Sequence, residues 1–209
     1  MSTKAKRTRI EDLRRAELIA AAHRVFMRHG LPGLTTARIC EEAGMSPGIL
    51  AYYFKGKDEV LFGMVRHNNR VLMQDVIAKL NSAASRWERF VAVVEGNFPA
   101  HAFEPDVAKA WLSVCAAAAS KPEFARLQTI FYARLNANLA SAFASVVGRD
   151  RQRILSLAVG ALIDGMWLRK AAGGDIGRDE AVHIIVAAAE KDFSAAELEM
   201  LRRPFARER

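Results

Sequence analysis

A turn between two short helical patterns, at Gly44, limits what this chain can fold into more than any other feature of the sequence. The residues after Thr35 and Thr36, two candidate N-caps, carry apolar side chains on one stripe at helical spacing. Gly44 then ends that helix, because the position after a helix end commonly needs a positive φ that glycine adopts without steric cost. Ser46 and Pro47 follow as N-cap and first helical residue. The segment therefore predicts two helices joined by a tight turn.

The second of these helices, from Pro47 to about Phe54, is so short that neighbouring elements must hold it in place. A longer helix is predicted before the pair, from about Ile10 to His29, and Gly30 ends it. Three helices in this order are typical of a helix-turn-helix module, whose last helix enters the major groove of DNA. The expected core of the module consists of Val25, Phe26, Leu34, Ile39, Ala43, Met45, Ile49, Leu50 and Phe54.

The positive charge of the chain is concentrated around this module. Residues 1–70 carry a net charge of +6, whereas the other 139 residues carry only +2 of the total of +8. A basic surface of this kind releases counterions when it binds DNA, so its binding depends strongly on salt. Residues 1–9 include four basic side chains and are expected to form a flexible basic tail, which either lies along DNA or is simply solvated.

The rest of the chain is predicted to be helical, with prolines and glycines marking the breaks and no alternating pattern of strands. A long connecting helix begins at Lys57 and can run to about Asn81. The expected fold is all-α with about nine helices. Its predicted parts are a basic tail (1–9), a helix-turn-helix domain (10–56), a helical ligand-binding and dimerisation domain (57–193, with 57–81 as the connecting helix) and a C-terminal tail (194–209).

Several classes of protein are disfavoured by what the sequence lacks. It has no apolar run long enough for a membrane span and no secretory signal, so we expect a cytoplasmic protein that does not contact a membrane. Cys40 and Cys115 are far apart, and the five histidines show no metal-ligand spacing. Neither a nucleophile elbow nor a glycine-rich phosphate loop is present. We therefore expect no enzymatic activity, no metal and no cofactor.

The short helix has two faces of different character. Its apolar residues Ile49, Leu50 and Phe54 are expected to point inward. The helix has no Arg, Asn or Gln, the side chains that commonly make paired hydrogen bonds to bases. Sequence readout would then depend on apolar contacts with thymine, on close backbone approach and on DNA shape. The residues left to face DNA are Ser46, Pro47, Gly48, Ala51, Tyr52 and Tyr53.

The module resembles the DNA-binding domain of TetR-family repressors. The residues that carry the resemblance are Thr35, Thr36, Ile39, Ala43, Gly44, Ser46, Gly48, Tyr53, Phe54, Lys57 and Leu61. The resemblance implies that Tyr53, Lys57 and Thr36 hold phosphates, and Tyr52 and the Pro47–Gly48 stretch are the better candidates for base edges. It also implies a homodimer, formed through the last two long helices, that reads a palindromic operator. The candidate DNA-binding residues are thus Thr36, Ser46, Pro47, Gly48, Tyr52, Tyr53 and Lys57.

Asp164 is the most unusual residue of the second domain. It interrupts an otherwise uncharged helical run and lies three residues before Trp167, hence on the same helix face. A carboxylate beside an indole suits a quaternary ammonium ion, through charge and cation-π attraction. In the alternative, Asp164 pairs with a cation such as Arg169 or caps a helix, and the tryptophan is part of the core.

Three segments, EGNF (95–98), KAWL (109–112) and ALIDGMWLR (161–169), resemble those of the BetI subfamily of choline-responsive repressors. That resemblance implies choline held by Phe98, Trp111 and Trp167, together with Tyr132 or Phe103, and balanced in charge by Asp164 or Glu104. Cys115 departs from the subfamily, which often has a tryptophan there.

The expected function is repression of the genes that convert choline to glycine betaine, with choline or a related quaternary ammonium ion as effector. Two alternatives stay open at this point. One is a TetR-type repressor that responds to another organic or drug-like ligand, and the other is a DNA-binding protein that needs no ligand.

Overall fold

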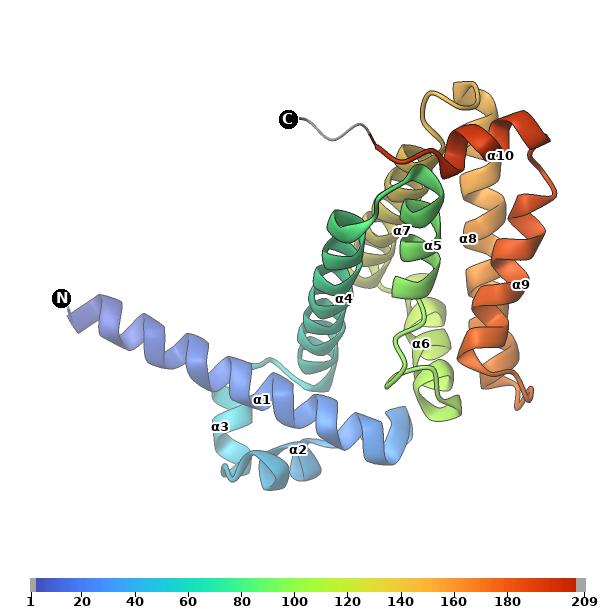
Figure 1. Ribbon diagram of the computed structural model, residues 1–209. Coiled ribbons are helices and arrows are strands. Elements are labelled where there is room, and N and C mark those ends of the chain that lie inside the picture. Colours follow the sequence, from blue (N-terminus) through green and yellow to red (C-terminus); the bar gives the residue numbers. More distant parts are fainter. Residues whose placement is uncertain (1–2, 206–209) are drawn as a thin grey trace. The chain divides into compact units, whose positions relative to one another are not determined.

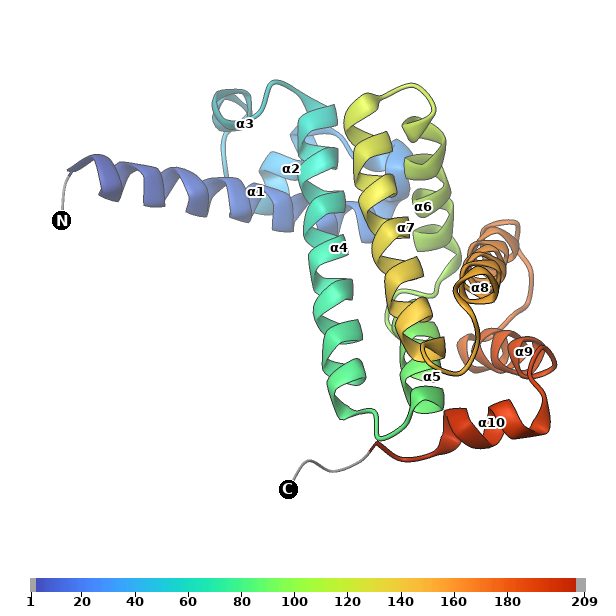
Figure 2. The same cartoon turned by 90° about the horizontal axis from the view of Figure 1, so that it is seen from above.

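The computed structural model describes residues 3–205, which form ten α-helices and no β-strand. The all-α prediction is confirmed, with one helix more than expected. The helices, shown in Figures 1 and 2, are α1 (Thr3–Gly33), α2 (Thr36–Ala43), α3 (Pro47–Tyr53), α4 (Lys57–Ser82), α5 (Arg86–Gly96), α6 (Pro105–Ala118), α7 (Pro122–Phe143), α8 (Arg149–Ala171), α9 (Arg178–Glu190) and α10 (Ala195–Arg202).

The chain divides into two compact units, residues 1–69 and 70–209, and the boundary falls inside α4. The sequence placed it at Lys57, where α4 begins. The first turns of α4 belong to the first unit because their apolar side chains, Val60 and Met64 among them, are fully buried there. Gly63 also lies close to α1, since a Cβ added to it would be 2.9 Å from Cδ1 of Ile19.

The turn between α2 and α3 forms as its local sequence predicts. The Thr35 side chain accepts a hydrogen bond from the backbone N–H of Arg38, so Thr35 is the N-cap of α2. Gly44 has φ 64° and ψ 33°, and its N–H bonds to the end of α2, as a left-handed C-cap does. Pro47 is the first residue of α3, although the Ser46 side chain makes no capping bond. Residues close in sequence therefore determine this turn.

The core of the first unit matches the prediction except at one position. Val25, Phe26, Leu34, Ile39, Leu50 and Phe54 are buried, and Ala43 and Met45 are partly buried. Ile49 was predicted to point inward, but 36% of its surface is exposed. The reason is geometric: Leu50 and Phe54 lie one turn apart and share the buried face, whereas Ile49 is about 100° around the helix from Leu50.

Both predicted tails contain helix. Helix α1 starts at Thr3, so residues 3–9 are helical rather than a flexible tail; they contain no Gly or Pro and are rich in good helix formers. Gly30, with φ 62°, interrupts α1 at the predicted end of the long helix. In the C-terminal tail, Ser194 and Glu197 form a capping box that starts α10, and Leu201 is buried. Residues 1–2 and 206–209 of the predicted tails lie outside the described residues.

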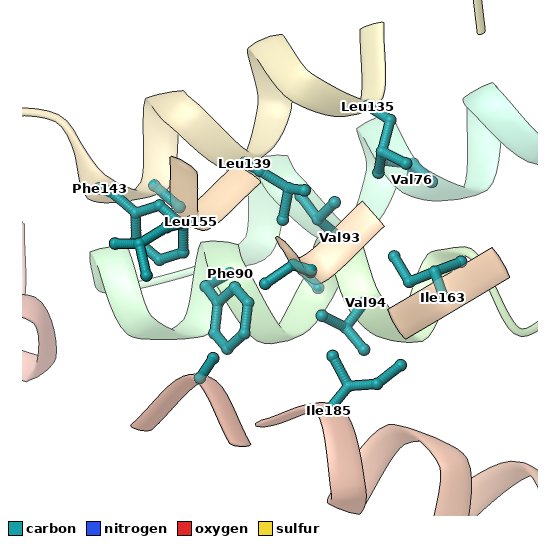
Figure 3. Packing of buried hydrophobic residues seen from close by; sticks show 14 of the residues in the cluster. Val76, Phe90, Val93, Val94, Leu135, Leu139, Phe143, Leu155, Ile163 and Ile185 are labelled. Carbon is teal, nitrogen blue, oxygen red and sulfur yellow. The ribbon is translucent and has the colours of Figure 1, made fainter. Parts of the chain in front are cut away.

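The core of the second unit lies around α5, as Figure 3 shows. Phe90, Val93 and Val94 of α5 lie among side chains of four other helices. The labelled side chains from the other helices are Val76 of α4, Leu135, Leu139 and Phe143 of α7, Leu155 and Ile163 of α8, and Ile185 of α9.

Among residues 3–205, no helix combines the length and apolar character that a membrane span needs.

Candidate functional site

The outer face of α3 presents the residues that were expected to meet DNA. Tyr52 is 66% exposed, and its ring meets that of Tyr53 edge to face, with centroids 4.9 Å apart. Tyr53 is partly buried, as suits a ring that packs on the protein and carries a polar hydroxyl group. The remaining predicted DNA-binding residues, Thr36, Ser46, Pro47, Gly48 and Lys57, are all exposed. The roles of these seven residues stay predictions.

Two details of α3 bear on how DNA is read. An added Cβ on Gly48 would meet no atom of the chain within 4 Å, so packing inside the protein does not require glycine there. The open space suits close approach of DNA to the backbone. Ile49 joins the exposed face and supplies an apolar side chain of the kind that contacts thymine methyl groups. The signal in the sequence is the spacing of Ile49, which lies about 100° around the helix from the buried Leu50.

Ion pairs between α1 and α2 hold the module together. Glu42 accepts hydrogen bonds from Arg24 and Arg28, each at 2.6 Å, and only 19% of its side chain is exposed. The bonds from Arg24 and then Arg28 lower the pKa of Glu42 below its usual value. The Glu42 carboxylate of α2 thus forms ion pairs with two arginines from successive turns of α1.

The predicted ligand-binding residues separate into two groups, of which the first, the Trp167 cluster, contains Phe98, Phe103 and Trp167. The rings of Phe98 and Trp167 are stacked with centroids 6.1 Å apart, and Phe103 meets Trp167 edge to face at 5.0 Å. The indole N–H donates to the carbonyl oxygen of Asn97 at 3.1 Å. The Lys170 ammonium lies 5.4 Å from the centre of the Phe103 ring. This cluster is packed against itself and already has a cation beside it.

The second group, the Asp164 cluster, contains Trp111, Phe131, Tyr132 and Asp164. The Tyr132 hydroxyl donates a hydrogen bond to Oδ2 of Asp164 at 2.9 Å. Ring centroids are 5.5 Å apart both between Trp111 and Phe131 and between Phe131 and Tyr132. All four side chains are partly buried. A carboxylate therefore lies at one end of a chain of three aromatic rings drawn from α6 and α7.

The surroundings of Asp164 disfavour its negative charge. Burial raises the pKa of the Asp164 carboxyl group, and the hydrogen bond from Tyr132 offsets only part of this rise. Burial and the neighbouring Asp164 charge raise the pKa of Tyr132 to about 12 and that of the Cys115 thiol to about 11. A cation placed here would stabilise the ionised carboxylate.

The structure also distinguishes between the alternatives for these residues. The hydrogen-bond partner of Asp164 is Tyr132, whereas Arg169 on the same helix is exposed. Glu104 is an exposed N-cap residue of α6. Phe131 was not predicted, because one phenylalanine in an amphipathic helix carries no sign of its neighbours in the fold.

An exposed apolar stripe runs along α8. Ile154, Leu157 and Leu168 are 60%, 48% and 54% exposed, and the exposed Ala158 and Ala161 lie between them at helical spacing. On α9, Ile184 is 38% exposed. Several large apolar residues exposed on neighbouring helices are typical of a surface that binds another protein.

Comparison with protein families gives two matches that together span most of the chain. Residues 18–64 match the model described as "Bacterial regulatory proteins, tetR family". Residues 86–193 match the model described as "BetI-type transcriptional repressor, C-terminal".

Curated relatives named "HTH-type transcriptional regulator BetI" cover most of the chain. That of Brucella suis is 36% identical over 80% of this chain and 84% of its own length. The relative in Brucella anthropi is 37% identical over 79% of this chain and 86% of its own length. The relative in Burkholderia mallei is 36% identical over 79% of this chain and 86% of its own length.

Solved structures show the same fold at low sequence identity. A putative transcriptional regulator from Pseudomonas aeruginosa PAO1 aligns with a TM-score of 0.72 and 23% identity, over 90% of this chain and 94% of its own. A putative transcriptional regulator from Saccharomonospora viridis, solved in complex with choline, aligns with a TM-score of 0.71 and 24% identity, over 85% and 93%.

Proposed function

Because this chain belongs to the TetR family of bacterial regulatory proteins, and its C-terminal half to the BetI-type transcriptional repressors, we propose that choline or a closely related quaternary ammonium ion controls its binding to operator DNA. Its relatives are regulators rather than enzymes. The genes under its control would be those that convert choline to glycine betaine. The choline bound by the Saccharomonospora viridis regulator supports this choice of effector.

The observation that carries the proposal is the Asp164 cluster. A quaternary ammonium ion cannot donate hydrogen bonds, so a protein recognises it by aromatic faces and a nearby negative charge. Trp111, Phe131 and Tyr132 supply the rings, and Asp164 supplies the charge. Because burial raises the pKa of Asp164, ionisation of Asp164 and binding of a permanent cation favour each other.

The Trp167 cluster has a different part in this proposal. Its three rings are in contact with one another, and the indole N–H is bonded to Asn97. Trp167 lies one helical turn after Asp164 on α8, so the cluster forms a packed wall that fixes that turn of the helix. The cation itself is bound by the Asp164 cluster.

The exposed stripe on α8 and Ile184 on α9 support a homodimer. Burial of Ile154, Leu157 and Leu168 against the same residues of a second copy would remove this apolar surface from water. A two-fold dimer presents two copies of α3, and its operator is then palindromic. The effector controls DNA binding only if it binds one spacing of the two α3 helices better than the other.

Calorimetric titration with choline tests the proposal. Asp164→Asn should weaken choline binding at least about tenfold, as expected for a partly desolvated cation site. The matched control is Asp175→Asn, which removes the same charge from an exposed loop of the same unit and should leave the affinity unchanged. The neutral carbon analogue of choline, 3,3-dimethylbutanol, should bind much more weakly than choline.

A mobility-shift assay with the intergenic DNA beside its own gene completes the test. Choline, glycine betaine and choline analogues are added in turn to the wild-type protein and to Asp164→Asn. Release of DNA by choline only from the wild type is the expected result. Equal choline affinity in Asp164→Asn and wild type, or equal binding of the neutral analogue, would refute the cation site.

A further inference from the structure

One side chain of the first unit, Arg15 of α1, makes contacts that the DNA-facing surface does not explain. Its guanidinium donates a hydrogen bond to the carbonyl oxygen of Tyr53, the last residue of α3. It also donates to Oε1 of Glu59 at 2.9 Å and lies 4.3 Å from the centre of the Phe54 ring. One residue of α1 therefore contacts the end of α3, the residue after it and the first turns of α4.

The three partners of Arg15 lie at the end of α3, in the connection after it and in the first turn of α4. Phe54 leaves the helix with extended backbone, φ −136° and ψ 136°. The second carboxylate oxygen of Glu59 accepts the backbone N–H of Lys55 at 2.8 Å, which closes the turn from Lys55 to Glu59. The bond from Lys55 and then that from Arg15 lower the pKa of Glu59, so the carboxylate stays ionised at neutral pH. Arg15 and Glu59 thus tie α3 and α4 together at this turn.

Helix α3 needs such support. It has seven residues, too few to be stable alone, and the last carbonyl groups of any helix lack partners within it. A cation at the C-terminal end also interacts favourably with the helix dipole. Ordinary exposed ion pairs contribute little to stability. The Arg15–Glu59 pair differs because the same guanidinium also meets a backbone carbonyl and a ring, which sets the orientation of the helix end.

We propose that Arg15 is a positioning residue for operator binding, acting through Glu59 and the Tyr53 carbonyl rather than by touching DNA. It holds the exposed face of α3 in one orientation relative to Lys57, the predicted phosphate contact at the start of α4. Phosphate contacts determine the register of a protein on DNA, so a rotated α3 would lose several contacts together. The Arg15–Glu59 pair also links the end of α3 to the first turn of α4, so that the two move together.

The sign of one charge change tests this proposal. Glu59→Gln removes a negative charge from a basic DNA-binding unit, so electrostatics alone predicts tighter operator binding. Loss of positioning predicts binding about tenfold weaker, equivalent to 1.4 kcal/mol. The matched control is Glu17→Gln, which removes the same charge from another ion pair of α1, that with Arg14 at 2.7 Å. It should leave binding unchanged or slightly tighter.

The measurement is fluorescence anisotropy of a DNA duplex selected from random sequences by the wild-type chain, at several salt concentrations. The number of active molecules is first determined by stoichiometric titration, well below the melting temperature. Weaker binding by Glu59→Gln, with a smaller salt dependence because fewer phosphates are neutralised, supports the proposal. The proposal is overturned if Glu59→Gln binds the duplex as tightly as the wild type does. It is also overturned if the only loss is in the fraction of active molecules.

A double-mutant cycle separates positioning from two independent effects. Arg15→Met should weaken binding, and the double variant with Glu59→Gln should be no weaker than Arg15→Met alone, because the pair acts as a unit. Arg15→Lys keeps the charge and should recover only part of the affinity, since an ammonium lacks the planar fork of a guanidinium. Additive losses in the cycle, or full recovery by Arg15→Lys, would also overturn the proposal.

Discussion

Replacement of Gly96 by alanine should destabilise the second unit, although the same change usually stabilises a helix. Gly96 is the last residue of α5 and faces Val76 of α4. A Cβ added to Gly96 would be 2.5 Å from Cγ2 of Val76 and 3.4 Å from its Cα. Valine in a helix has essentially one side-chain rotamer, so Cγ2 cannot turn away. The two helices would have to move apart.

Two opposing terms determine the size of the effect. Alanine gains at most about 1 kcal/mol over glycine in a helix interior, and less at a helix end. Overpacking of a close contact costs about 1–3 kcal/mol. The expected net loss is about 1–2 kcal/mol, which for a chain of this size lowers the melting temperature by roughly 2–8 °C. The displaced helix end also precedes Asn97, whose carbonyl accepts the Trp167 hydrogen bond.

Thermal melting, followed by circular dichroism at one fixed protein concentration, measures this loss. The matched control is Gly160→Ala in α8 of the same unit, where the added Cβ would meet Cδ2 of Leu135 at an ordinary 3.8 Å. That variant should melt at the same temperature as wild type or up to a few degrees higher. If Gly96→Ala melts no lower than Gly160→Ala, the close approach of α4 and α5 does not limit this position.

Three further results are expected. Tyr53→Ala should weaken DNA binding on all sequences, whereas Tyr52→Ala should change the preference among operators; titrations on matched and mismatched duplexes check this, and a uniform loss for both would contradict the division. Choline affinity, measured by calorimetry from pH 8 downward, should fall as Asp164 is protonated. Because burial raises the pKa of Asp164, this fall should occur at a higher pH than the protonation of an exposed aspartate. Asp164→Asn should show no such fall. Bonds from Arg151 and then Ser194 lower the pKa of Glu197 to about 2. The stabilisation of α10 by Glu197 should therefore be complete above about pH 4.5 and lost as the pH falls toward 2. Hydrogen exchange of α10 in Glu197→Gln, which should lack this acid transition, measures it.

Much of the first unit could be predicted because its signals are local. The cap at Thr35 and the left-handed turn at Gly44 each depend on residues within about four positions. The capping box of Ser194 and Glu197 is equally local, so the start of α10 is predictable from the sequence, although the tail prediction for residues 194–209 contains no helix. Ile49 was placed wrongly because apolar character alone does not say which side of a short helix is buried.

The candidate ligand site was only partly predictable. Helical spacing identified Asp164 as an unusual carboxylate and put Trp167 on its face. It could not identify Tyr132 as the hydrogen-bond partner, because the two residues are 32 positions apart and come from different helices. Nor could it show that Trp167 packs with Phe98 and Phe103, which reach it from the segment after α5.

The amino-acid sequence alone was sufficient for the helical class and the helix-turn-helix, because caps, turns and periodicity act within a few residues, and its resemblance to known sequences indicated the family. Tertiary packing determined which aromatic rings surround Asp164, which face of α3 is exposed and how Arg15 reaches the end of that helix. These contacts join residues far apart in the chain. Their geometry depends on how whole helices pack, which local spacing does not specify.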